Sequence, residues 1–182
     1  MREPVHSCEE FLLSRRSIRA FRDEDVSVDL ILKAIDIARY APSSGNRQPW
    51  EFMIIKSKDR IKELADIHPW ARPALGASAV VIVLVNEKQS PVSYIVDGAI
   101  AATYLWLALH CLGLGAVWLQ TLRNTNKLRE ILSIPQEYLP VAILAIGYPA
   151  EKPKTKPRKS LEELVHVEEF GNKLLKKNLS KR

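Results

Sequence analysis

Cysteine and histidine are too scarce in this sequence to build the usual metal sites or a disulfide framework. The chain has 182 residues, with only two cysteines, Cys8 and Cys111, and four histidines. The cysteines form no CxxC pair, and the histidines form neither HExxH nor a Cys/His zinc spacing. We therefore expect no metal site, and the low cysteine content favours a reducing, cytoplasmic setting.

Several other signatures of catalysis and targeting are missing. There is no GxxxxGK[ST] phosphate loop and no GxSxG nucleophile motif, and the N-terminus lacks the pattern of a signal peptide. Residues 113–120 begin GxG, but Trp118 stands where a dinucleotide fingerprint has glycine, so we reject a Rossmann site. We assign no catalytic side chain. An enzyme that lacks a nucleophile motif and a metal site can take its chemistry from a bound cofactor.

Positive charge is concentrated near the C-terminus. Residues 151–182 carry ten Lys/Arg and five Asp/Glu, whereas residues 1–150 carry 17 and 16. The basic segment has three interpretations, which are a polyanion partner, a solvated tail, or a segment that reaches back to an anionic ligand. The rest is ordinary globular composition, 47% hydrophobic and 26% charged. We expect one domain over residues 1–150 and a basic extension over residues 151–182.

One apolar run, Gly98–Leu119, is long enough to span a bilayer. Asp97 stands at its start, and Gly113 and Gly115 interrupt it near the end. These features favour a buried central helix followed by a buried strand, so we expect no membrane segment.

Helices and strands are predicted to alternate along the chain, which favours a sheet between helical layers. Ala79–Val85 is continuously apolar, so both faces of that strand should be covered. Ser7, with Glu10, should cap a short helix that ends near residues 14–16. The other predicted helices are 28–40, 58–67, 92–112 and one ending at 132; the other strands are 50–56, 116–120 and 141–148.

Residues 15–21 (RRSIRAF) place three arginines and a serine within five positions. Guanidinium groups bind phosphate oxygens in a bidentate way, and a serine hydroxyl adds a short donor. One interpretation is therefore a bound anion. The other is a solvated charge run at a helix end, and the residues alone do not choose between them.

Residues 41–50 (APSSGNRQPW) join a predicted helix to a strand and are rich in hydrogen-bond donors. A planar heterocycle with polar edges needs such donors around its rim. An ordinary capping loop uses the same Pro, Gly and Asn for its turns, so both interpretations stay open.

Together these segments resemble the FMN-dependent nitroreductase family, in the family's order, over about residues 11–165. RRSIRAF resembles its N-terminal arginine–serine signature. PSSGNRQPWEF resembles the signature that lines the flavin from the partner subunit. DGAIAATYLWLALHCLGLGAVW resembles the central dimer helix and the strand after it. GYP followed by KPRKS resembles the segment that closes on the FMN phosphate.

The resemblance implies an α+β fold, a three-layer α/β/α sandwich with a central mixed sheet that dimerises through the long central helix. It implies a homodimer with FMN at the interface, NADH or NADPH as co-substrate, ping-pong chemistry, and a nitro compound, quinone or similar small-molecule acceptor. It implies no nucleic-acid partner. The flavin-binding residues that it carries over are Arg15, Arg16, Ser17, Arg19, Pro42, Ser43, Ser44, Asn46, Gln48, Leu119, Gln120, Thr121, Lys156 and Arg158.

The segment between Ile67 and Ser78 is shorter in this chain than in longer members of the family. Trp70 and Arg72 are candidates for a substrate lid there, and a plain loop is the alternative. Two other functions stay open at this point. One is a same-fold enzyme that fragments the flavin or dehalogenates its substrate, and the other is a non-enzymatic basic protein that binds polyanions.

Overall fold

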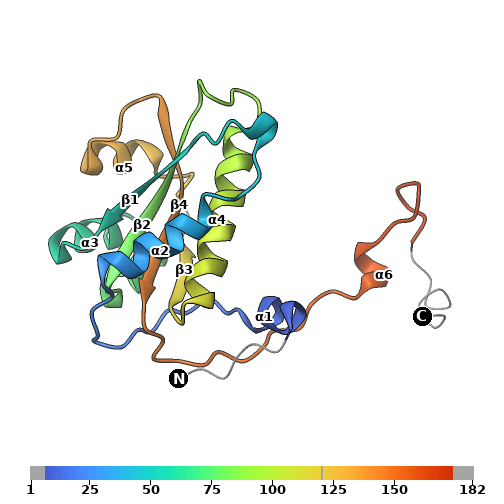
Figure 1. The fold of residues 1–182 in the computed structure, drawn as a ribbon, viewed down its shortest axis with the longest axis horizontal. Helices are drawn as coiled ribbons and strands as arrows, with labels where there is room; N and C mark the ends of the chain where they lie inside the picture. Colours follow the sequence, from blue (N-terminus) through green and yellow to red (C-terminus); the bar gives the residue numbers. More distant parts are fainter. Residues whose placement is uncertain (1–6, 120, 174–182) are drawn as a thin grey trace.

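A four-stranded sheet forms the centre of the computed structural model, which describes residues 7–119 and 121–173 (Figure 1). The strands lie in the order β1-β2-β4-β3, and each neighbouring pair is antiparallel. Their bounds are β1 Trp50–Ile55, β2 Ala79–Asn86, β3 Gly115–Leu119 and β4 Tyr138–Gly147. The α+β class is confirmed.

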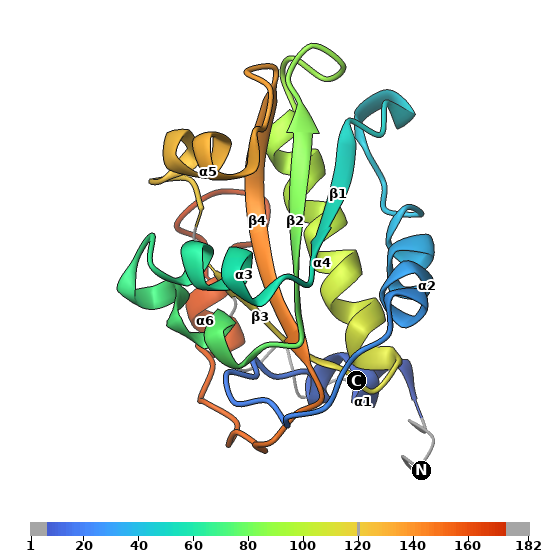
Figure 2. The ribbon, with the colours of Figure 1, turned by 90° about the vertical axis from the view of Figure 1, so that its left-hand side faces the viewer.

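The expected mixed character of the sheet needs correction. In the described part of the chain, parallel pairing is confined to one isolated bridge, between Ser17 and Ala116. Between β1 and β2 the chain passes through α3 (Lys58–Ala65) and residues 69–76 on one face of the sheet (Figure 2). It then returns to the edge that it left, so β2 begins beside the end of β1, with Ile55 opposite Val80, and the two strands are antiparallel.

Helices cover both faces of the sheet, as predicted. Helices α2 (Val28–Ala38) and α4 (Tyr94–Cys111) pack on one face, while α3, α5 (Thr125–Leu132) and the 3-10 helix η2 (Pro69–Gly76) lie on the other (Figures 1 and 2). Side chains of β2 alternate between the two layers. Val81 and Val83 enter the core under α4, and Val80 and Ile82 enter the core under α3.

Helix α4 runs along the sheet and is seated closely on it. Its length and apolar composition would also suit a membrane span. Here one side of it is buried on the strands, and a Cβ on Gly98 would lie 2.4 Å from Val85 and 2.7 Å from Val141. Glycine at position 98 therefore sets the distance between the helix and the sheet.

The C-terminal segment passes the N-terminal helix before it leaves the body of the fold (Figure 1). Helix α1 (Cys8–Ser14) is capped by the Ser7 hydroxyl, as predicted. After β4, residues 148–160 pass α1 and continue outward to the one-turn helix α6 (Leu161–Leu164), away from the sheet (Figure 1).

Candidate functional site

Residues 15–19 form an extended segment against the edge strand β3. Arg15 leaves α1 with a ψ of 136°, and the Ile18 N–H donates to the Ala116 carbonyl at 3.0 Å. Gly115 permits this close approach, because a Cβ there would lie 2.9 Å from the Ile18 side chain. The arginine cluster is thus fixed to the sheet edge rather than left on a free helix end.

Arg15 has an environment that suits an anion. Its guanidinium carbon lies 4.1 Å from the ring centroid of Trp106, and the Trp106 indole donates to the Ala116 carbonyl at 3.1 Å. The Arg15 Nη1 is buried without a hydrogen-bond partner. Burial, followed by the charges of Arg158 and Arg16, lowers the pKa of Arg15. The folded protein therefore holds this cation at a cost that a bound anion would offset.

Arg16 differs from Arg15, because protein atoms already accept from its guanidinium. Nη1 donates to the carbonyls of Leu13 at 2.6 Å and of Arg15 at 2.8 Å. Nη2 donates to the Thr155 hydroxyl at 2.5 Å. These bonds cap the end of α1 and tie it to the C-terminal segment. Phosphate binding by Arg16 stays a prediction, and its contacts favour a structural role.

The C-terminal segment returns to the arginine cluster through Glu151. The Oε1 of Glu151 accepts the backbone N–H groups of Arg19 at 2.5 Å and Ala20 at 3.0 Å. Further along, Arg158 lies close enough for its charge to lower the pKa of Arg15. One chain therefore brings both ends of the predicted phosphate anchor together. Lys156 is exposed.

The predicted contact residues that the structure describes at the end of β3 are buried. The side chains of Leu119 and Thr121 are 4% and 0% exposed. Leu119 packs in the core under α3, so a ligand at this strand end would meet backbone rather than side chain. Gln120 lies outside the described residues.

The loop with the remaining predicted residues, 42–48, lies at the far end of α4 from α1 (Figure 1). The Ser44 N–H donates to Asp97, in the first turn of α4, at 3.0 Å. Trp106, on which Arg15 stacks, follows about 14 Å further along the helix axis. Within one chain, the loop and the arginine cluster therefore stay apart.

The loop has an unusual backbone. The 3-10 turn η1 (Ser44–Asn46) contains Gly45 at a φ of 57°, and Asn46 and Gln48 have φ of 55° and 47°. Left-handed angles are unfavourable for residues other than glycine and cluster at functional sites. The Ser43 hydroxyl accepts the Gln48 N–H at 3.0 Å, while Pro42 is exposed.

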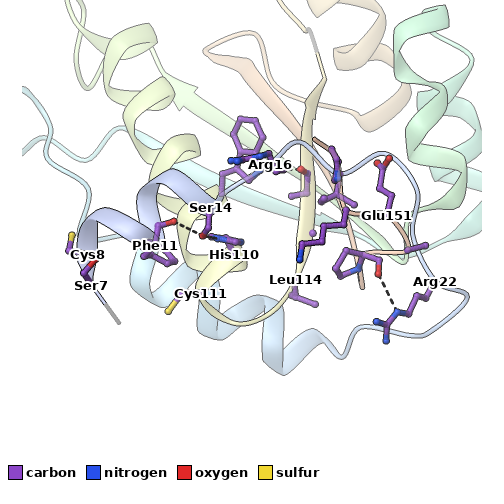
Figure 3. Close-up of a pocket in the computed structure, with 18 residues that line it drawn as sticks. Ser7, Cys8, Phe11, Ser14, Arg16, Arg22, His110, Cys111, Leu114 and Glu151 are labelled. Carbon is purple, nitrogen blue, oxygen red and sulfur yellow. Dashed lines mark hydrogen bonds between the residues drawn. The ribbon is translucent and has the colours of Figure 1, made fainter. Parts of the chain in front are cut away.

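A groove of about 1150 Å³ lies beside the cluster, between α1, the end of α4, the start of β3 and residues 149–153 (Figure 3). Ser14 and His110 are hydrogen bonded at 2.8 Å, and Phe11 stacks on His110 with ring centroids 5.2 Å apart. Among the predicted flavin residues that the structure describes, Arg16 alone lines this groove, together with Ile18. Alternate residues of an extended segment face opposite sides, which explains the separation.

The lid candidates Trp70 and Arg72 belong to η2 rather than to a plain loop. The His68 side chain caps this helix by accepting the Trp70 N–H at 3.2 Å. Trp70 is 77% exposed and Arg72 is also exposed. A lid role for these residues stays a prediction.

Three residues of the site were missed by reasoning from the sequence. Asp97 had a visible signal, since it is a lone carboxylate at the start of an apolar helix. Trp106 was hidden inside that apolar run, and Glu151 looked like one charge of a basic tail. Their roles depend on contacts with Ser44, Arg15 and Arg19, which are distant in sequence.

Comparison with known proteins finds one family in the family model, the related sequences and the solved structures. The family model described as "Nitroreductase family" matches residues 12–70 and 62–148. A protein of Methanothermobacter thermautotrophicus, provisionally named an NADH dehydrogenase/NAD(P)H nitroreductase, is 32% identical over 81% of this chain and 80% of its own length. The "FMN reductase [NAD(P)H]" of Bacillus subtilis is 30% identical over 88% of this chain and 73% of its length.

Among solved structures, the chain is similar to an FMN-dependent nitroreductase from Clostridium difficile. The TM-score is 0.80 at 31% identity, covering 88% of this chain and 98% of the other. An iodotyrosine deiodinase of Thermotoga neapolitana is 28% identical over 77% of this chain and 88% of its own length.

Proposed function

The chain belongs to the nitroreductase family, and on that premise we propose that its FMN phosphate binds between Arg15 and Arg158. The protein is an FMN-dependent NAD(P)H oxidoreductase. FMN, when bound, would accept a hydride from a nicotinamide and pass the electrons on to a second substrate. We propose a nitro compound, a quinone or a similar small molecule as that acceptor. We also propose that the enzyme acts in the cytoplasm, where its two free cysteines stay reduced.

The buried Nη1 of Arg15 is the observation that carries this assignment. It is an orphaned donor on a cation whose neighbours include two further arginines. Phosphate oxygens satisfy such donors and neutralise such a cluster. Ser17 and Arg19 follow in the same extended segment and would continue the site along the edge of β3.

The site is proposed to be completed by a second copy of the chain. The loop 42–48 lies at the opposite end of α4 from the arginine cluster, so an antiparallel pair of α4 helices would bring one chain's loop to the other chain's arginines (Figure 1). The side of α4 away from the sheet keeps apolar residues at the surface, including Val96, which is 60% exposed. An exposed apolar stripe of this kind is typical of an interface.

Flavin loading tests the core of the proposal. The purified protein is expected to be yellow, and NADH or NADPH should bleach the flavin bands without oxygen. Apoprotein should take up FMN and quench its fluorescence. Protein that is colourless and takes up no FMN would refute the assignment. Turnover with quinones, nitroaromatics and free flavin, each with both nicotinamides, would then rank the acceptors.

The two-chain site can be tested by mixing two defective chains. Arg15→Met damages a chain's own half-site, and Gln48→Gly damages the half that it gives to its partner. Random pairing makes about half of the dimers mixed, and each mixed dimer has one intact site, so about a quarter of the sites should bind FMN at wild-type affinity. If each site lay within one chain, no intact sites would form. Sedimentation should give twice the 20.6 kDa chain mass.

Reductive dehalogenation is a second candidate, because one relative is named an iodotyrosine deiodinase. Iodide release from iodotyrosine by the FMN-loaded, reduced enzyme tests it directly. Release slower than quinone or nitroaromatic reduction by several orders of magnitude would exclude it as the main activity.

A further inference from the structure

A buried carboxylate holds the loop that we assign to the flavin. Asp97 lies in the first turn of α4 and is 2% exposed. Its Oδ1 accepts the Ser44 backbone N–H at 3.0 Å, and its Oδ2 accepts the Ser90 hydroxyl at 2.8 Å. Both oxygens therefore serve donors from outside the helix.

The position of this carboxylate is set by the sheet. The next residue is Gly98, where α4 approaches β2 and β4 so closely that a Cβ would lie 2.4 Å from Val85. A side chain on the preceding residue has little freedom to move with respect to the strands. The Ser44 N–H is therefore held at a fixed place relative to the sheet.

The loop needs such an anchor. Asn46 and Gln48 keep left-handed φ angles of 55° and 47°, which persist only where the surroundings impose them. Within the described chain, the hydrogen bonds of residues 43–48 are internal to the loop, except the one from Ser44 to Asp97. Beyond the buried flanking residues Ala41 and Trp50, this bond is the link in the described chain that ties the middle of the loop to the rigid part of the molecule.

We infer that Asp97 is a positioning residue for the flavin site. It fixes the Ser44 N–H, and so determines where the loop presents its donors to the flavin held by the neighbouring copy. This inference rests on the proposed function, because it takes the loop to line the flavin. Asp97 acts through the loop and touches no cofactor itself.

Two pairs of variants separate the hydrogen bond from other effects. Ser44→Pro removes the donated N–H, while Ser44→Ala keeps it. Proline is accommodated because Ser43 is extended, with a ψ of 156°, and because position 44 begins a helical turn. Asp97→Ala removes both acceptors, while the isosteric Asp97→Asn can accept from Ser44 and donate to Ser90.

Three measurements on the full chain, with a folding control, compare these variants with wild type. Trypsin cleavage after Arg47, an exposed loop residue, reports loop anchoring in the apoprotein. Fluorescence titration gives the Kd for FMN, and the visible absorption bands of bound FMN report the surroundings of its ring. Far-ultraviolet circular dichroism checks folding, and Ser44→Pro carries the test if Asp97→Ala does not fold.

Ser44→Pro and Asp97→Ala should be cleaved about tenfold faster than wild type, with a Kd raised about tenfold and shifted flavin bands. Asp97→Asn should be cleaved at the wild-type rate, and Ser44→Ala more slowly than Ser44→Pro, because both variants lose the hydroxyl that accepts from Arg47 and only the proline also loses the N–H. Unchanged cleavage of Ser44→Pro would overturn the anchor. Faster cleavage with an unchanged Kd and spectrum would overturn its role toward the flavin. Wild-type protein that binds no FMN would instead refute the proposed function and, with it, the flavin half of this inference.

Discussion

Replacing Arg15 by methionine should separate the stability of the apoprotein from its affinity for FMN. Methionine keeps an unbranched stem that can pack on Trp106, and it removes the guanidinium whose Nη1 has no partner. One hydrogen bond from a charged donor contributes about 1.5–3 kcal/mol. The Kd for FMN should therefore rise about 10- to 100-fold.

The stability of the apoprotein, unlike its affinity for FMN, should not fall in this variant. Burial and the charges of Arg158 and Arg16 lower the pKa of Arg15, so its charged form is disfavoured in the fold. The free energy of unfolding without FMN should stay level or rise in Arg15→Met. Stabilisation by saturating FMN should fall by about 1.4 kcal/mol for each tenfold loss of affinity.

Urea unfolding with and without FMN, together with fluorescence titration, measures both quantities. Lys62→Met is a matched control, because it removes one exposed cation from α3 on the other face of the sheet. A Kd within twofold of wild type would refute the phosphate assignment. A less stable apoprotein would refute the reasoning about the buried charge.

Three further predictions concern other parts of the chain. Arg158→Ala should raise the Kd for FMN less than the loss of the buried guanidinium does, because Arg158 is exposed; an equal or greater effect in the same titration would contradict this. Gly98→Ala should lower the free energy of unfolding by about 1–3 kcal/mol in urea, since its Cβ would lie 2.4 Å from Val85; wild-type stability would show that α4 can shift. The hydrogen bond from Lys56 is the main cause that lowers the pKa of Asp25. The stabilisation from this ion pair is therefore fully present above the ordinary carboxyl pKa of about 3.9 and is lost as pH falls through the lower pKa of Asp25 in the folded protein. The difference in unfolding free energy between wild type and Asp25→Asn should therefore shrink below about pH 4. A difference that is constant from pH 7 to pH 3 would exclude this ion pair as its source.

The elements were predictable from local signals. Ser7 caps the helix that follows it, and the apolar run at 79–85 is buried on both faces. These features depend on neighbours in the sequence, through capping and hydrophobic periodicity. The direction of the strands did not follow from alternation, because it depends on the path that each connection takes in space, such as residues 56–78 between β1 and β2.

The candidate site was predictable only as a set of segments. The sequence could not tell Arg15 from Arg16, although one has a buried donor without a partner and the other caps α1. That difference arises from the extended backbone after Ser14, which alternates the side chains. The long-range contact of Glu151 with the Arg19 N–H had no local signal either.

The extended segment 15–19 has a consequence for how the protein can be altered. It separates two sets of side chains, because Arg16 and Ile18 line the groove while Arg15 stacks on the Trp106 ring near the charge of Arg158. The two sets stay coupled, since Trp106 also lines the groove and the charge of Arg16 lowers the pKa of Arg15. An apolar exchange at Ile18 can therefore reshape the groove without changing the charge of the anion side, whereas any change of Arg16 alters both.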